Sequence, residues 1–225
     1  AEMLASIYRA LTASQTGAAR LYFETPCIEW ILRNQVLWDF FYEHCSLFSG
    51  RTLEAAFHAA GFQNAGTRPI FAGQYHWLEA SFQLSSSQDR ATSARESRTK
   101  LPVAKPLRDL AFAYQDAEQM QIDRWRSMLR AQHLAGGVCL WGAGAKGVTL
   151  ANLVDPDGEL IDCVVDLNPA KQNCYLPGTG HAVISPEALT TRRVGTVVVM
   201  NPNYRQEIAR QLSLVAPHLT LVVLP

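Results

Sequence analysis

The sequence lacks several features that would assign a chain of 225 residues to a class at once. No apolar run reaches the roughly 18 residues that a membrane-spanning helix needs. Twenty basic residues balance twenty acidic ones, so the net charge is zero. This balance argues against a general nucleic-acid binder and against a polybasic membrane anchor. Residues 1–4 open no basic segment or long apolar segment, so we see no secretory signal.

Cysteine is scarce and shows no spacing that would indicate cross-links. The five cysteines are Cys27, Cys45, Cys139, Cys163 and Cys174. Their number is odd and no pair is separated by two residues, so neither a disulfide framework nor a zinc knuckle is indicated. We expect a reduced, cytoplasmic protein with no metal in this chain. Cys139 and Cys163 stand in apolar runs and are expected to be core residues.

Apolar residues make up 48% of the chain, which is enough to build a folded core. Composition divides the sequence into three blocks. Residues 1–84 and 106–225 are rich in apolar residues, whereas residues 85–105 are rich in serine and charge and end among prolines. The sequence therefore predicts two domains joined by a linker over residues 85–105.

The third block alternates between helical and strand patterns. We predict a long helix over residues 107–134, ended by Gly136-Gly137. Short apolar strands are expected at residues 138–141, 161–165, 181–184, 196–200 and 219–224, with helices opening at residues 148, 185 and 204. Continuous apolar strands between helices predict a Rossmann-like α/β fold, with a parallel five-stranded sheet covered by helices on both faces.

The first block mixes both kinds of element. Helices are expected at residues 3–11 and 52–60, and strands at residues 19–24, 63–71 and 75–83. Gly73-Gln74 suits a hairpin turn between the last two strands. Residues 28–48 form a mixed aromatic segment without a clear period.

A glycine-rich turn is the sharpest local motif. Residues 142–147 read Gly-Ala-Gly-Ala-Lys-Gly, between a predicted strand and a predicted helix, and Asp166 ends the next strand. In that context Gly142 and Gly144 let a backbone approach a pyrophosphate, Lys146 adds a cation and Asp166 can accept from a ribose hydroxyl. A doubly wound sheet also needs such a turn for purely architectural reasons, and this second interpretation stays open.

A second candidate site is the segment at residues 38–45, which reads Trp-Asp-Phe-Phe-Tyr-Glu-His-Cys. A histidine beside a glutamate among aromatic rings suits a general base in a site that excludes water. The alternative is that the aromatic residues are core and that Glu43-His44 is a polar break at the surface. On a regular strand Glu43 and His44 would point to opposite faces, so a loop or a helix end is required for both to reach one substrate.

Further polar residues follow the predicted strands. Glu24 ends a strand, and Asn201 and Tyr204 lie in a loop after the strand at residues 196–200. Open α/β sheets place ligands at this edge, although each position alone is also typical of ordinary turns.

These strings together resemble the later half of S-adenosylmethionine-dependent sugar C-methyltransferases. The resemblance rests on Glu-Thr-Pro at residues 24–26, Tyr-Glu-His at 42–44, Gly-Gln-Tyr at 73–75, Trp-Gly-Ala-Gly-Ala-Lys-Gly at 141–147, Val-Asp-Leu-Asn-Pro-Ala-Lys at 165–171 and Asn-Pro-Asn-Tyr at 201–204. It covers nearly the whole chain. It implies the last strands and helices of a class I methyltransferase fold, followed by the Rossmann-like C-terminal domain of that family.

The resemblance also implies a chemistry. Family members methylate a carbon beside a keto group on a nucleotide-linked deoxysugar, after a base removes the proton from that carbon. By the motif match His44 is the base, and Glu43 orients it or holds the sugar. Two tyrosines often precede that glutamate in the family, whereas Phe41 stands before Tyr42 here, so one hydroxyl that could touch the sugar is absent.

The remaining expectations concern ligands and partners. The substrate-binding candidates are Tyr42, Glu24, Tyr75, Gly142, Gly144, Lys146, Asp166, Lys171, Asn201 and Tyr204. The resemblance implies S-adenosylmethionine as cofactor, held by a turn that is not in this chain, and the turn at residues 142–147 is not that site. We expect the chain alone to be inactive, and a partial sheet in residues 1–84 to order poorly or to drive self-association. The alternative function is a nucleotide- or NAD(P)-binding module, and a domain that only buttresses the substrate cleft is the third possibility.

Overall fold

The computed structural model describes residues 2–41, 44–84 and 105–223, which form two compact units. Unit 1 comprises Ala1–Arg33 and Cys45–Phe112, and unit 2 comprises Asn34–His44 and Ala113–Pro225. The predicted linker over residues 85–105 lies outside the described residues except for Lys105. None of the described helices combines the length and the apolar character that a membrane crossing requires.

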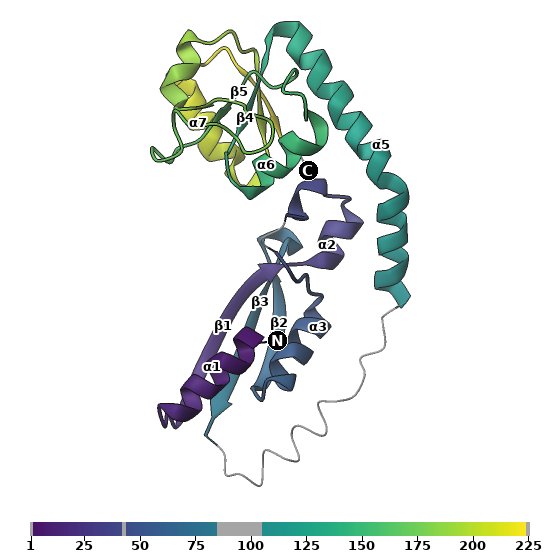
Figure 1. Ribbon diagram of the computed structural model, residues 1–225, viewed down its shortest axis with the longest axis vertical. Helices are drawn as coiled ribbons and strands as arrows, with labels where there is room; N and C mark the ends of the chain where they lie inside the picture. The colour runs from purple at the N-terminus through teal and green to yellow at the C-terminus, as the bar shows by residue number, and fades with distance from the viewer. Residues whose placement is uncertain (1, 42–43, 85–104, 224–225) are drawn as a thin grey trace. The chain divides into compact units, whose positions relative to one another are not determined.

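In its described part, unit 1 is built on a three-stranded antiparallel sheet (Figure 1). The strands β1 (Ala18–Pro26), β2 (Gln63–Ile70) and β3 (Tyr75–Gln83) lie in the order β1-β3-β2, and β3 runs antiparallel to both neighbours. Alternation along β3 turns Leu78, Ala80 and Phe82 to one face, where all three are buried. This agrees with the last strands that the family resemblance implies.

Helices α1 (Glu2–Ala13) and α3 (Gly50–Ala59) supply the other half of the unit 1 core. Tyr8 of α1 meets Phe62 and Phe82 edge-on, with ring centroids 5.4 and 5.1 Å apart. Ser49 starts α3 with a capping box, in which its side chain accepts from the Thr52 N–H. The predicted turn at Gly73-Gln74 is instead a short 3-10 helix, η2 (Phe71–Gly73), followed by Gln74.

Unit 2 contains the parallel sheet that the sequence predicts (Figure 1). Its five described strands are β4 (Val138–Trp141), β5 (Cys163–Val165), β6 (Val183–Ile184), β7 (Thr196–Val199) and β8 (Thr220–Val223), in the order β6-β5-β4-β7-β8. Every pairing between them is parallel. The predicted Rossmann-like architecture is therefore confirmed.

Helices cover both faces of this sheet. Ile208 and Leu212 of α7 (Arg205–Val215) pack in one core cluster with Cys139 and Cys163, which are 0% exposed as predicted for core cysteines. The alternate residues of the same strands, such as Leu140, are equally buried. The flanking helices α5 (Lys105–Gly136) and α6 (Ala145–Val154) contribute buried leucines of their own. The helix expected after Ser185 is the 3-10 helix η3 (Pro186–Thr191), and η4 (Pro202–Tyr204) precedes α7.

Residues 34–41 and His44 belong to unit 2, although the sequence pattern groups them with the first block. The 3-10 helix η1 (Leu37–Asp39) contacts α6. Trp38 meets Trp125 of α5 edge-on, with centroids 5.9 Å apart, and Gln121 donates to Gln35 at 2.7 Å. The short helix α2 (Ile28–Arg33), which precedes this segment, remains in unit 1.

Candidate functional site

The glycine turn after β4 is tightly built around its first and third glycines. Gly142 has a φ of +115°, a conformation that favours glycine, and its N–H donates to Val165 O at 2.7 Å. A Cβ on Gly147 would lie 2.0 Å from Gly142 O, so only glycine lets α6 approach the turn this closely. Gly142 and Gly147 thus have architectural roles.

Gly144 is different, because the protein's own packing does not require a glycine there. Its φ of −89° suits any residue, and a Cβ built on it meets no described atom within 4 Å. It is the N-cap residue of α6, and no side chain caps that end of the helix. The first backbone N–H groups of α6 therefore face a position that a ligand can approach closely.

A cavity of about 460 Å³ opens beside this turn within unit 2. Its lining includes Gly144, Thr149, Lys171 and Tyr175. Phe41, from the segment before α3, completes the wall. The lining is mainly apolar with a few polar groups, a composition typical of small-molecule sites.

Asp166, at the end of β5, is already engaged by the turn. One carboxylate oxygen accepts from Ala143 N at 2.9 Å and from Lys171 Nζ at 3.2 Å, and the other accepts from Asn168 N at 2.9 Å. Burial opposes ionisation of this carboxyl, but the two backbone N–H groups and Lys171 outweigh it and lower its pKa. Lys171 also donates to Ala143 O at 3.0 Å, so Asp166 and Lys171 hold the turn in shape.

Lys146, which the sequence suggests as a phosphate-binding cation, instead forms an ion pair with a protein carboxylate. Its Nζ lies 2.5 Å from Asp39 Oδ1, and the Asp39 side chain is only 5% exposed. Because Asp39 belongs to η1, this ion pair fixes η1 to the start of α6. The cationic group that lines the cavity is Lys171.

His44 contacts Phe41, which lines the same cavity. The two rings are in contact, with centroids 4.1 Å apart and planes tilted by 40°. His44 Nδ1 is buried and has no hydrogen-bond partner among the described residues. Tyr42 and Glu43, the two other candidates in this motif, lie outside the described residues.

The remaining candidates lie elsewhere. In unit 2, Asn201 accepts from Asn203 N at 3.0 Å and so caps η4, and Tyr204 is 56% exposed. Of the residues described, neither lines the cavity. In unit 1, Glu24 is exposed on β1, and Tyr75 begins β3 with its ring 5.9 Å from that of Phe71.

The sequence does not predict two polar clusters that the structure contains. Each joins residues that are far apart in the sequence, so local spacing does not mark them. In unit 2, His181 Nε2 lies 2.9 Å from Asp155 Oδ2 and His181 Nδ1 lies 2.6 Å from Thr179 Oγ1. Asp155 also accepts from three consecutive N–H groups at residues 159–161, so this buried network fastens a loop. In unit 1, Cys27, Glu29 and His76 converge.

Comparison with known proteins gives one family. The model of the family described as C-methyltransferase C-terminal domain matches residues 80–225. No curated protein matches the chain.

Proposed function

Because the chain belongs to the C-methyltransferase C-terminal domain family, we propose that it carries the acceptor side of a C-methyltransferase whose substrate is a nucleotide-linked keto-deoxysugar. In this proposal the cavity of unit 2 takes the nucleotide-sugar, and His44 is the base that acts on the sugar. The family supports methyl transfer to carbon, whereas the sugar, the base and the methyl donor are our inference.

One observation carries the proposal. Phe41 and Gly144 both line the cavity, and the ring of Phe41 is also in contact with the ring of His44. The two motifs that the sequence separates by about 100 positions therefore belong to one compact unit. A substrate anchored at the glycine turn would extend toward the imidazole.

The anchoring chemistry suits a diphosphate. The uncapped start of α6 offers N–H groups and a partial positive charge to an anion. Lys171 adds a cation at the cavity wall, and Phe41 and Tyr175 offer aromatic surfaces for a sugar or a base. Lys146, by contrast, would act indirectly by fixing the segment that carries Phe41 and His44.

The proposed role of His44 is general-base catalysis. A proton on the carbon beside a ketone is acidic because the resulting negative charge spreads onto the carbonyl oxygen. His44 would accept that proton at a ring nitrogen, and the C–H electron pair would form the enolate. The enolate carbon is the nucleophile that a C-methyltransferase alkylates. Positioned general bases contribute about 10²–10⁴-fold to such steps.

The implied cofactor, S-adenosylmethionine, does not fit the described residues of unit 1. Its strands are antiparallel, and no described strand there leads through a glycine-rich turn into a helix. The described strand–glycine–helix unit follows β4 in unit 2, where Phe41 and Lys171 line the cavity that we assign to the acceptor. We therefore derive no step through the donor from these residues.

A dinucleotide-binding module is the second candidate, and the open position at Gly144 favours it equally. Asp166 argues against it, because both oxygens of its carboxylate already accept hydrogen bonds from the protein. A ribose hydroxyl would have to compete with these bonds.

Calorimetric titration of the full chain separates the two candidates. We expect binding of a thymidine diphosphate keto-deoxysugar and no comparable binding of NADH or NADPH. Gly144→Ser should weaken sugar-nucleotide binding about tenfold or more, because a serine hydroxyl would cap α6 and occupy the anion position while preserving the helix. Gly66→Ser is the matched control, since Gly66 in unit 1 also faces open space. Unchanged affinity in Gly144→Ser, or tight dinucleotide binding without sugar-nucleotide binding, would refute the proposal.

A further inference from the structure

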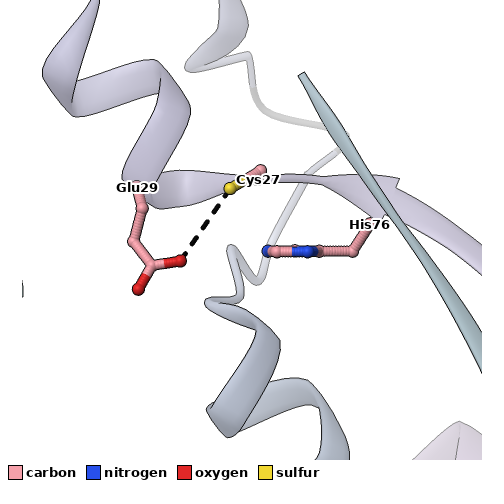
Figure 2. Close-up of side chains that lie close together, drawn as sticks. All are labelled: Cys27, Glu29 and His76. Carbon is pink, nitrogen blue, oxygen red and sulfur yellow. Dashed lines mark hydrogen bonds between the residues drawn. The ribbon is translucent and has the colours of Figure 1, made fainter. Parts of the chain in front are cut away.

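Three side chains of metal-ligating type meet in unit 1. Cys27, Glu29 and His76 place one sulfur, one carboxylate oxygen and one ring nitrogen within 4.8 Å of one another. Figure 2 shows the His76 ring reaching from β3, with a nitrogen at the end nearest to the sulfur and the carboxylate. The Cys27 thiol and the Glu29 carboxylate are 3.9 Å apart.

The fold brings these groups together through strand pairing. Cys27 follows the last residue of β1, and its N–H donates to Gln74 O at 2.9 Å. The register of β1 with β3 sets Thr25 opposite His76, which turns inward on the core face of β3. Glu29 stands in the first turn of α2, two residues after Cys27. His76 therefore projects from β3 and Glu29 from α2, and Cys27 stands at the junction between β1 and α2, held to β3 by its backbone hydrogen bond.

Two of the three side chains are buried, and their polar atoms make few hydrogen bonds within the protein. Cys27 and His76 are 7% and 8% exposed. His76 Nε2 is buried and forms no hydrogen bond with any described residue, and a thiol 3.9 Å from a carboxylate makes only a weak contact. Native structures rarely leave a buried polar nitrogen without a partner, so this nitrogen is well placed to bind a metal ion.

The protonation states suit coordination by His76 and require deprotonation of Cys27. Burial lowers the pKa of His76, although Glu29 and Glu54 act in the opposite direction, so the ring is neutral and able to ligate at neutral pH. Burial raises the pKa of the Cys27 thiol, and Glu29 adds to this effect. Glu54 itself is engaged, because one oxygen accepts from Thr67 N at 2.8 Å and from Thr67 Oγ1 at 2.6 Å.

We propose that Cys27, Glu29 and His76 bind a divalent transition metal of the zinc type. Sulfur, nitrogen and carboxylate oxygen together are ligands typical of Zn²⁺, whereas Mg²⁺ and Ca²⁺ avoid thiolate. Zinc–ligand bonds of about 2.0–2.3 Å place tetrahedral ligands about 3.3–3.8 Å apart. Because no separation in the cluster exceeds 4.8 Å, each must shorten by at most about 1–1.5 Å, and the half-buried Glu29 side chain can accommodate such a change.

Binding follows simple stoichiometry. The thiol releases its proton to solvent, the thiolate sulfur bonds to the metal, and His76 and Glu29 contribute an electron pair each. Three protein ligands leave a fourth position for water or another small ligand. The metal would fasten the junction of β1 and α2 to β3. This proposal differs from the expectation, drawn from the cysteine spacing, that the chain holds no metal. The proposal does not depend on the acceptor site in unit 2.

Cobalt titration of the full chain tests the site, because Co²⁺ substitutes for Zn²⁺ and gives a thiolate-to-metal charge-transfer absorption. We expect this absorption in the wild type at one equivalent of metal, and its loss on addition of Zn²⁺. Cys27→Ser should abolish it. Glu29→Gln and His76→Gln should weaken cobalt binding at least about tenfold, since even outer partners of ligands cost 10–100-fold. Cys45→Ser, at an exposed cysteine, and His58→Gln are the matched controls and should bind cobalt as the wild type does.

A thermal measurement guards against variants that simply fail to fold. Zn²⁺ should raise the unfolding midpoint of the wild type and of Cys45→Ser, because a ligand that binds only the folded state stabilises it. It should raise the midpoint of Glu29→Gln by clearly less at the same metal concentration, and that side chain is accessible enough for its replacement to be tolerated. Absence of the charge-transfer absorption in the wild type, or its persistence in Cys27→Ser, would overturn the proposal.

Discussion

At the scale of single residues, Asp166 shows how one carboxylate organises the candidate site. It accepts hydrogen bonds from two backbone N–H groups and from Lys171, and these contacts join the end of β5 to the glycine turn. The side chain is 13% exposed, so the bonds are partly shielded from water. Asp166 would thus affect the ligand that we propose at Gly144 only indirectly, by positioning the turn.

This arrangement predicts a pH-dependent contribution to stability. The folded state lowers the pKa of Asp166 below its ordinary value of 3.8, so the unfolded chain binds the proton more readily. The stabilisation is complete above that ordinary value and is lost as the pH falls through the lowered value. Urea unfolding at several pH values should show Asp166→Asn to be less stable than the wild type near neutral pH, with the difference vanishing in acid.

Asp157→Asn, at an exposed turn, is the control and should match the wild type throughout. A difference between Asp166→Asn and the wild type that is as large in acid as at neutral pH would show that ionisation of Asp166 does not stabilise the turn.

The sequence predicts which residues carry chemically useful groups better than it predicts which residues those groups contact. The glycine turn and Asp166 were identified because their spacing is local. Lys146 was expected to approach a phosphate, but its ion pair with Asp39 spans 107 positions and follows only from the packing of η1 on α6. The cluster of Cys27 and His76 was missed for the same reason, since β-strand register assembles it.

At the scale of elements, the segment around η1 brings the aromatic motif that contains His44 into the same unit as the glycine turn at residues 142–147. Trp38 is 2% exposed and packs edge-on against Trp125 of α5. The neighbouring pairs, Gln35 with Gln121 and Asp39 with Lys146, hold the same segment to unit 2. The position of Phe41 at the cavity depends on this anchoring.

We predict that Trp38→Ala destabilises unit 2 by about 3–5 kcal/mol, the usual cost of removing a buried aromatic side chain. Urea unfolding followed by circular dichroism measures the loss. Trp77→Ala, which removes a half-buried indole from unit 1, should leave the unit 2 transition in place. A change of less than about 1 kcal/mol in Trp38→Ala would mean that the segment is not anchored as described.

The elements of the third block were predictable because their strands are buried on both faces and read as continuous apolar runs. The long helix over residues 107–134 was likewise found, as α5. The assignment of residues 34–44 to unit 2 was not predictable, because contacts with α5 and α6 decide it and no local period marks them.

At the scale of the whole molecule, two compact units divide the proposed tasks. The cavity that we propose for the acceptor, with Phe41 in its wall and His44 against Phe41, belongs to unit 2, and the proposed metal cluster belongs to unit 1. The family match at residues 80–225 includes the glycine turn but not His44, so the role of His44 rests on the Tyr-Glu-His motif and on its contact with Phe41. Self-association of the chain stays a prediction, motivated by β1 at one edge of the described sheet of unit 1.

The most direct test of His44 as the base follows hydrogen exchange on the acceptor sugar, which requires no methyl donor. The full chain is incubated in deuterated water with a nucleotide-linked keto-deoxysugar, and deuterium at the carbon beside the ketone is measured by nuclear magnetic resonance. We predict exchange faster than in buffer alone, a slowing of about 10²–10⁴-fold in His44→Ala, and no change in His218→Ala, which alters an exposed histidine. Equal exchange rates in His44→Ala and the wild type, or wild-type exchange no faster than in buffer, would contradict it.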